Sequence, residues 1–303
     1  MRILLLGKNG QVGWELQRAL APLGELVACG SGEADLRDPA ALATLVRRVA
    51  PQLVVNAAAH TAVDRCESEP EGAQAINADA PGLLAREAAA HDALLVHFST
   101  DYVFDGSGSQ PWREDDATGP LSAYGRSKLA GEQAIRTSGC RHLILRTSWV
   151  YASRGANFAR TMLRLAGERE SLNVVDDQIG APTGAELIAD VTAHALRGVL
   201  RRPELAGTYH VAAAGATSWH GYASHLVDAV RALAPSTVKV KPGAIHAVPS
   251  SAYPTAARRP MNSRLDCSRL QQAFDLELPD WRVGVDRLLA ELAPHALHAT
   301  PAR

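Results

Sequence analysis

Short apolar runs alternate with amphipathic segments along the first half of the chain. The apolar runs have the length of buried strands, and the segments between them repeat hydrophobic residues every three to four positions, as helices do. The predicted strands are Ile3–Leu6, Leu26–Cys29, Ala34–Leu36, Leu53–Ala57, Leu94–Ser99 and His142–Arg146. The predicted helices are Val12–Leu23, Pro39–Val49, Ala80–Ala90 and Ala123–Thr137. This alternation predicts an α/β fold, a Rossmann-like doubly wound parallel sheet covered on both faces.

The regular alternation of predicted strands and helices ends after Trp149. Further helices are predicted at Phe158–Ala166, Glu186–Leu200, Trp219–Leu233 and Trp281–Leu292, and short strands at Leu172–Val175 and Thr208–Val211. The segment Ser236–Arg264 is rich in Pro, Ser and Ala and is expected to be mostly loop. We expect a larger N-terminal domain over residues 1–150, to which segments from about 172–217 return, and a smaller C-terminal α/β domain formed mainly by residues 151–303.

Composition narrows the class of protein. The 303 residues carry a net charge of −1 and no dense basic run, which disfavours nucleic acid as a partner. No stretch approaches the roughly 18 apolar residues of a membrane span, and the start of the chain lacks the apolar region of a signal peptide. The four cysteines are scattered, without a C-x-x-C pair, which predicts reduced thiols in a cytoplasmic protein.

Three glycines follow the first predicted strand. Gly7, Gly10 and Gly13 have the spacing G-x-x-G-x-x-G and lead into a helix. Glycines in this place allow a tight turn and let the backbone approach a pyrophosphate, while the helix N-terminus offers free N–H groups to it. The pattern predicts a dinucleotide site.

The end of the second strand bears on the choice between NAD(H) and NADP(H). A carboxylate there binds the ribose 2′-hydroxyl and repels a 2′-phosphate. Gly30 and Ser31 follow this strand, and the first acid is Glu33, so NADPH is expected to serve as well as NADH. Asp35 and Leu36 are expected beside the adenine; the alternative is a helix cap ahead of the next helix.

Acid–base chemistry is indicated by Tyr124 and Lys128, which stand four residues apart in A-Y-G-R-S-K-L-A and therefore share one helix face. A tyrosine normally titrates near pH ~10, and a neighbouring ammonium lowers its pKa and makes it a usable general acid. Thr100 ends the strand before this helix, where its hydroxyl can stabilise an oxyanion. Asp101 follows it and is expected to frame the substrate. These residues predict hydride exchange between a nicotinamide and a carbonyl or alcohol.

The loop after the fourth strand, N-A-A-A-H-T, also lies at a carboxyl end, where small alanines let a ligand approach the backbone. His60 in this loop could act as a base, but a packing role is favoured because Tyr124 and Lys128 form a better acid–base pair.

Seven motifs occur in a fixed order: G-K-N-G-Q-V-G-W-E-L, N-A-A-A-H-T-A-V-D, S-T-D-Y-V-F-D-G, Y-G-x-S-K, R-T-S-W-V-Y, D-D-Q-x-G-x-P-T and R-P-M-N-S-R-L-D. From Met1 to about Leu292 the chain resembles the dTDP-4-dehydrorhamnose reductases, which are extended short-chain dehydrogenases/reductases. The resemblance implies that NAD(P)H reduces the C4 ketone of dTDP-4-dehydro-L-rhamnose, the last step of dTDP-L-rhamnose synthesis.

The resemblance also implies roles for individual residues. Tyr124 donates the proton, Lys128 lowers the pKa of the tyrosine and binds the nicotinamide ribose, and Thr100 holds the C4 oxygen. Asp101 and Trp149 contact the substrate. The implied cofactor contacts are Gly10, Gln11, Val12, Asp35, Leu36, Ala59, His60 and Thr61.

Some members of this family bind Mg²⁺ through glutamates at a dimer interface, and Glu15, Glu186 and Glu291 match those positions. The resemblance thus implies possible Mg²⁺ binding and a possible homodimer. Three carboxylates suit a hard cation, although each also fits an ordinary helix surface.

Arg258, Arg259 and Arg264 stand together near the end of the chain and are expected to bind a diphosphate, with pairing to internal carboxylates as the alternative. We take Arg259 as a substrate contact.

Sugar-nucleotide dehydratases and epimerases, and non-catalytic regulatory subunits, share this fold and remain alternatives. A dehydratase needs a carboxylate pair where this chain has Asp101 and Tyr102, and a regulatory subunit need not keep Thr100, Tyr124 and Lys128.

Overall fold

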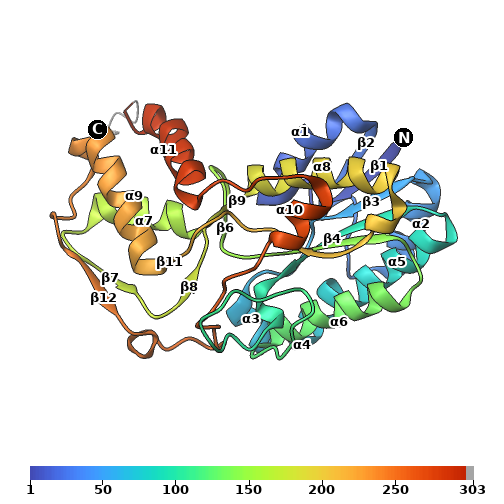
Figure 1. Ribbon diagram of the computed structural model, residues 1–303, viewed down its shortest axis with the longest axis horizontal. Helices are drawn as coiled ribbons and strands as arrows, with labels where there is room; N and C mark the ends of the chain where they lie inside the picture. The colour runs from blue at the N-terminus through green and yellow to red at the C-terminus, as the bar shows by residue number, and fades with distance from the viewer. Residues whose placement is uncertain (298–303) are drawn as a thin grey trace.

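The computed structural model describes residues 1–297. Its larger lobe is built on a six-stranded sheet in which all neighbouring strands are parallel, in the order β10-β5-β4-β3-β1-β2 (Figure 1). These strands are β1 (Arg2–Leu6), β2 (Glu25–Cys29), β3 (Leu53–Asn56), β4 (Leu94–Thr100), β5 (His142–Thr147) and β10 (Gly207–His210). The predicted Rossmann-like doubly wound sheet is therefore confirmed.

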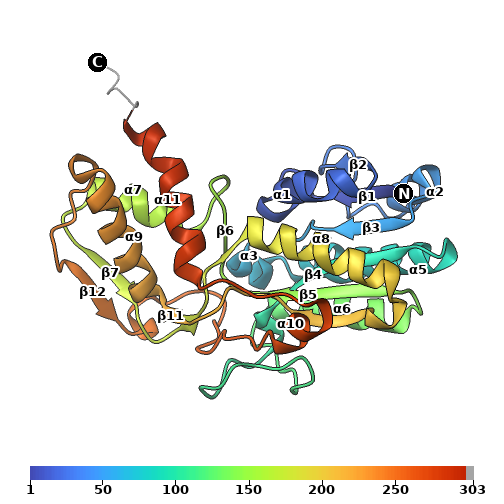
Figure 2. The same ribbon diagram turned by 45° about the horizontal axis from the view of Figure 1, so that its top comes forward.

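Alternation along each strand divides the core of this lobe between the two faces of the sheet. Ile3 and Leu5 pack on one face with helices α1 (Gln11–Leu20), α8 (Ala185–Arg201) and α10 (Ser268–Phe274). Leu4 and Leu6 pack on the other with α2 (Pro39–Val49), α5 (Ala80–Ala90) and α6 (Ala123–Thr137). Figure 2 shows α1 and α8 together over one face of the sheet. Because both faces are covered, the central strands β1 and β3 are buried along nearly their whole length.

The smaller lobe holds α7 (Phe158–Glu168), α9 (Trp219–Leu233) and α11 (Trp281–Leu297) around a separate core that includes Tyr222 and Trp281. Its main sheet pairs β7 (Leu172–Val175) with β12 (Ile245–Val248) in parallel. The chain passes between the lobes several times, because α8, β10 and α10 belong to the larger one (Figure 1).

Shorter elements complete the described chain. They are η1 (Ala21–Leu23), α3 (Val63–Ser68), α4 (Pro70–Gln74), η2 (Ala75–Asp79), η3 (Asp101–Val103), β6 (Val150–Tyr151), β8 (Ile179–Gly180), β9 (Thr183–Gly184), η4 (Pro203–Leu205), β11 (Thr217–Ser218), η5 (Pro235–Thr237) and η6 (Ser250–Ala252). Within residues 1–297, no helix is both long and apolar enough to cross a membrane.

Most predicted elements are found within one or two residues of their expected ends, and one prediction is wrong. The segment Ala34–Leu36 is not a strand, because the Ala34 amide turns back to the carbonyl of Gly30 at 2.9 Å. The segment Ser236–Arg264 is mostly loop, as predicted, and contains the short strand β12. The end of the expected range 151–303 lies outside the described residues.

Candidate active site

The glycine loop between β1 and α1 is as tight as the spacing of its glycines predicts. Gly7 has φ +87°, and a Cβ there would stand 2.7 Å from the backbone nitrogen of Ala58. A Cβ on Gly13 would stand 2.0 Å from the Gly7 carbonyl oxygen. The start of α1 lies directly against the loop, and for this reason neither position tolerates a side chain.

A cavity of about 340 Å³ opens beside this loop. Gly7, Gly10, Asp35, Leu36 and Ala59 line it, so the structure brings together three segments that the sequence assigned to the cofactor. The other predicted cofactor contacts are not among its lining residues; they are Gln11, Val12, Gly13, His60, Thr61, Tyr124 and Lys128. Small residues and backbone form most of the wall, which suits the adenosine part of a dinucleotide.

Glu33 follows the last residue of β2 by four positions, but its side chain folds back to the end of this strand. Its carboxylate accepts a hydrogen bond from the Gly30 amide at 2.8 Å and from Lys8 Nζ at 2.5 Å. Hydrogen bonding to Lys8 lowers the pKa of Glu33. A carboxylate therefore binds the backbone of Gly30, a residue that lines this cavity, whereas the sequence alone placed the first acid farther along the loop.

Tyr124 lies in the first turn of α6, which begins where Ser122 caps the amide of Gly125. Its ring meets the ring of Tyr102 edge to face, with 5.5 Å between centroids. Burial raises the pKa of Tyr124, and contact with the Thr100 hydroxyl lowers it in part. The structure thus brings Tyr124 and Thr100 together, and the raised pKa keeps the partly buried phenol protonated.

Lys128 lies one turn further along α6 and is buried. Its Nζ donates to the carbonyl oxygen of Phe98 at 2.6 Å and lies 3.1 Å from His97 Nε2. Burial lowers the pKa of Lys128 to about 8. The sequence predicted that Lys128 lowers the pKa of Tyr124. The structure differs, because burial dominates the pKa of the phenol and the ammonium is bonded to β4.

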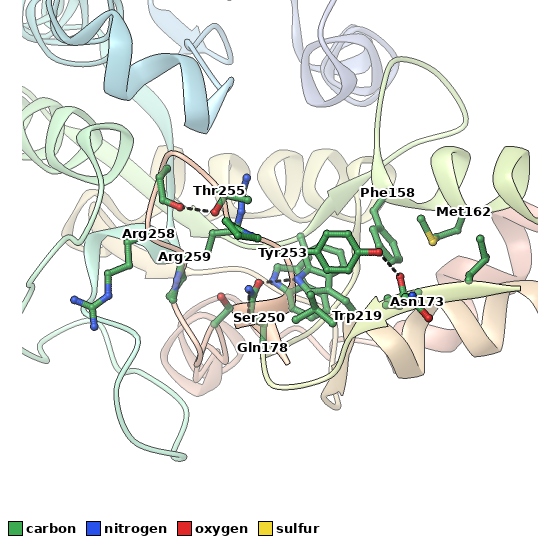
Figure 3. A pocket seen from close by; sticks show the side chains of 18 of the residues that line it. Phe158, Met162, Asn173, Gln178, Trp219, Ser250, Tyr253, Thr255, Arg258 and Arg259 are labelled. Atoms are coloured by element: carbon green, nitrogen blue, oxygen red, sulfur yellow. Dashed lines mark hydrogen bonds between the residues drawn. The ribbon is translucent and has the colours of Figure 1, made fainter. Parts of the chain in front are cut away.

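A second cavity, of about 740 Å³, lies between the lobes next to Tyr102 (Figure 3). Trp149 has φ +49° and stacks on Trp219 with 3.6 Å between ring centroids. Both rings line the cavity. A bulky residue in the left-handed region costs conformational energy, so the stack holds Trp149 in a strained position at the wall of the site.

Arg258 and Arg259 also line this cavity, whereas Arg264 does not (Figure 3). Arg259 Nη2 donates to Asp64 at 2.7 Å, and Arg264 Nη1 donates to Asn262 at 3.0 Å. The three arginines are therefore not one cluster. Arg259 both faces the cavity and pairs with a carboxylate of the larger lobe.

Two site-forming residues had no signal in the sequence. Trp219, which backs Trp149, reads there as the first residue of an amphipathic helix. Asn77 lies in η2, a π-helical turn, and its side chain binds the His60 amide at 2.8 Å, the His60 carbonyl at 3.1 Å and the Ser127 hydroxyl at 3.1 Å. Asn77 thus ties the loop after β3 to α6, while His60 Nδ1 packs against Cys66 Sγ at 3.2 Å.

The three glutamates expected to hold a metal line one cavity of about 220 Å³. Arg287 pairs with both Glu186 and Glu291, and Arg18 pairs with Glu15. Burial raises the pKa of Glu186, and Glu291 raises it further. Among the described side chains, no three acidic, histidine or cysteine groups are close enough to hold a metal ion. The structure gives the metal prediction no support.

A parallel sheet with a glycine loop at one strand end and Thr, Tyr and Lys at another is typical of a nicotinamide-dependent reductase. The family model described as "RmlD substrate binding domain" matches residues 1–293. The dTDP-4-dehydrorhamnose reductase of Escherichia coli K12 is 55% identical, over 96% of this chain and 98% of its own length. That of Salmonella typhimurium is 54% identical with the same coverage. The chain belongs to the dTDP-4-dehydrorhamnose reductase family.

Solved structures agree with this assignment. A dTDP-4-dehydrorhamnose reductase from Bacillus anthracis, in complex with NADP, has a TM-score of 0.85 and 33% identity, covering 96% of this chain and 99% of its own. A dTDP-glucose 4,6-dehydratase from Streptomyces venezuelae has a TM-score of 0.79 at 18% identity over 97% of both chains, which shows the fold alone.

Proposed function

We propose that this chain reduces the C4 ketone of dTDP-4-dehydro-L-rhamnose with NAD(P)H and releases dTDP-L-rhamnose, the last step of dTDP-L-rhamnose biosynthesis. Full-length identity of 55% to a reductase of this name supports the proposal. Within the structure, it is supported by the contact of Tyr124 with Thr100, next to Tyr102, which lines the cavity between the lobes; Lys128 lies one turn further along α6.

The larger lobe is proposed to hold the dinucleotide. Gly7 and Gly10 would lie against the pyrophosphate, and Asp35, Leu36 and Ala59 line the cavity for the adenosine part. The bound nicotinamide supplies hydride to the C4 carbon. Gln11, Val12, Gly13, His60 and Thr61 remain predicted contacts from the family resemblance.

The protein groups act on the oxygen of the ketone. The Thr100 hydroxyl stabilises the negative charge that develops on this oxygen, and Tyr124 gives its proton to it. Because burial raises the pKa of Tyr124, the phenol is protonated at neutral pH, as a general acid must be. Lys128 lies one turn further along α6 than Tyr124 and is proposed to bind the nicotinamide ribose.

The smaller lobe and the segment around Arg259 are proposed to hold the nucleotide sugar. Trp149 and Trp219 offer a flat aromatic wall, and Arg258 and Arg259 offer guanidinium groups to the diphosphate. Asp101 is proposed as a further sugar contact beside Thr100. A homodimer and Mg²⁺ at Glu15, Glu186 and Glu291 stay predictions.

A dehydratase or epimerase on the same fold is the competing function. Tyr102 is partly buried beside Asp101, and burial raises its pKa, so a carboxylate base for deprotonation at C5 is missing at this position. A regulatory subunit is disfavoured because the catalytic residues are all present.

The test is consumption of NADPH and of NADH by the purified protein with dTDP-4-dehydro-L-rhamnose, followed by loss of nicotinamide absorbance. The product is identified by mass and NMR. Release of dTDP-L-rhamnose with one reduced nicotinamide consumed per sugar supports the function. Loss of water from dTDP-glucose, or tightly retained NAD⁺ with no net consumption, would point instead to the competing enzymes.

A further inference from the structure

A buried chain of polar side chains runs from the loop after β3 to Lys128, and the reaction described so far does not use it. Asn56 Nδ2 lies 3.2 Å from His97 Nδ1, and His97 Nε2 lies 3.1 Å from Lys128 Nζ. At the far end, the Ala58 amide donates to Asn56 Oδ1 at 3.2 Å. The three side chains are at most 2% exposed, so they find their hydrogen bonds within the protein.

The Ala58 amide fixes the direction of this chain, because a backbone N–H can only donate. Asn56 must turn its oxygen toward Ala58, so its NH₂ group faces His97. His97 Nδ1 then accepts, and the proton of a neutral imidazole lies on Nε2, facing Lys128. An amine nitrogen accepts this proton, whereas an ammonium has no lone pair to do so. Every donor and acceptor in this series of side chains therefore has a hydrogen-bond partner only when Lys128 is an amine.

Burial keeps His97 neutral, since it lowers the pKa of the imidazole well below its usual range, and the charge of Lys128 adds to this. An imidazolium therefore does not form, and the mismatch between two donors appears whenever Lys128 is charged.

We propose that His97, held by Asn56, is a positioning residue for the reduction: it fixes the Lys128 side chain and weakens its hold on one of its three protons. This inference rests on the proposed function for its role in turnover. When Tyr124 gives its proton to the substrate oxygen, the O–H bond breaks and a phenolate remains. Lys128 then loses an N–H proton that restores the phenol, its new lone pair accepts from His97 Nε2–H, and water later returns a proton to Lys128.

The other charged groups around Lys128 set the balance that His97 shifts. Glu132, one turn along α6, favours the ammonium, but its carboxylate is shared with Arg146 of β5 at 2.7 Å and Arg136 at 2.9 Å. The Phe98 carbonyl accepts from either form of Lys128. With burial included, the pKa of Lys128 falls to about 8, so both forms are within reach at neutral pH.

Groups from the neighbouring elements act on the phenol instead. Asp101 and Tyr102 from η3 and Cys66 from α3 each raise the pKa of Tyr124. The group of β4 that faces Lys128 is the imidazole ring of His97.

The Asn56→Asp variant reverses the direction of hydrogen bonding from residue 56 to Lys128, and the two side chains have nearly the same size. A carboxylate accepts from both the Ala58 amide and His97 Nδ1–H, so His97 Nε2 becomes an acceptor for the Lys128 ammonium. We expect the pKa of Lys128 to rise by about one unit, the worth of one hydrogen bond to a charged group. The His97→Phe variant removes the opposing N–H and offers a ring face to the cation, so it should also raise this pKa.

Protonation of Lys128 can be read without any activity, by ¹³C NMR of the lysine ε-carbons. The sequence contains four lysines, Lys8, Lys128, Lys239 and Lys241, and Lys128→Met assigns the buried one. The double variant is the control. If Asn56→Asp acts through His97, its shift should largely vanish once His97 is Phe, whereas a purely through-space effect of the new charge would be additive.

The basic limb of the pH profile for ketone reduction should move with the NMR titration, by the same amount in each variant. An unchanged Lys128 titration in both single variants, or an equal Asn56→Asp shift with and without His97, overturns the inference. Absence of turnover of the nucleotide sugar by the unmodified chain overturns the proposed function instead, and leaves the titration result to stand by itself. If Asn56→Asp does not fold, His97→Phe alone must still raise the pKa of Lys128, and no rise refutes the proposal.

Discussion

The Thr100 hydroxyl donates a hydrogen bond to the carboxylate of its neighbour Asp101, with 3.1 Å between Oγ1 and Oδ1. The same hydroxyl accepts from the Tyr102 amide, so its orientation is set by β4 and η3 before a substrate arrives. The other oxygen of Asp101 is buried and has no hydrogen-bond partner within the described part of the chain. A buried carboxyl group thus stands directly beside the proposed oxyanion contact.

Burial raises the pKa of Asp101 from 3.8 to about 6. A raised pKa in the folded state stabilises the fold below the unfolded pKa, and this contribution is lost as pH rises through about 6. The shift of about two units corresponds to roughly 3 kcal/mol at most. Asp101→Asn should therefore gain stability relative to the unmodified chain between pH 4 and pH 7. Urea denaturation across this range measures it; parallel stability curves for the two proteins would contradict the prediction.

Tyr124→Phe should lower kcat by roughly 10²–10⁴-fold, the usual contribution of a general acid. Cofactor affinity should barely change, because Lys128, the proposed ribose contact, is left in place, and the phenyl ring keeps its packing on Tyr102. Steady-state kinetics with the nucleotide sugar, together with fluorescence titration of NADPH, provide the measurement. Near-normal kcat in this variant would remove Tyr124 from the proton transfer.

The carboxylate of Glu33 bears on cofactor preference. It holds Lys8 and the Gly30 amide at the end of β2, where a 2′-phosphate would compete with it. Glu33→Gln keeps an acceptor for the Gly30 amide but releases Lys8, so the ratio of kcat/KM for NADPH over NADH should rise by a few-fold to about tenfold, and less at high salt.

The unmodified chain is expected to use both cofactors, with NADPH equal or better. A strong preference for NADH that Glu33→Gln leaves unchanged would show that this carboxylate does not set the choice. Lys8→Met is the matched control, since it should remove the gain when combined with Glu33→Gln.

Arg259→Ala should raise the substrate KM by roughly tenfold or more, the loss of a charge-assisted hydrogen bond, while cofactor KM changes little. Asp64→Asn is the matched control, because it removes the partner of Arg259 but leaves the guanidinium in the cavity. Equal rises in both KM values, or loss of thermal stability with unchanged KM in Arg259→Ala, would place this arginine in the framework of the fold.

Local sequence patterns correctly predicted the elements in which the burial of side chains follows a regular pattern along the element. Helix α6 and strand β4 are examples, since continuous apolar strands and helical spacing report burial directly. The strand predicted at Ala34–Leu36 fails because a three-residue pattern cannot distinguish a strand from a turn closed by the Gly30 carbonyl. The π-helical turn of Asn77 depends on its approach to Gly131 of α6, where a Cβ would lie 2.1 Å from the Asn77 carbonyl oxygen. Such a contact between distant segments leaves no local pattern.

In the site, too, features with a local sequence pattern could be predicted and contacts between distant segments could not. Thr100, Tyr124 and Lys128 could be proposed from the sequence because each lies at a predictable place on a strand end or a helix turn. The partners of Lys128 could not, since His97 reads as one polar residue inside a buried strand. Likewise, Trp219 reaches Trp149 only after the smaller lobe has folded.

The path of the chain between the lobes has a consequence for synthesis and folding. β5 remains an open edge of the growing sheet until β10 has left the ribosome, and β10 begins only at Gly207. The face that carries Ile3 and Leu5 likewise waits for α8. A nascent chain that stops near residue 150 exposes a sheet edge and an apolar face together, the combination that promotes aggregation. The larger lobe is thus incomplete in the first half of the chain, and it can close only after β10 and α8 have been synthesised.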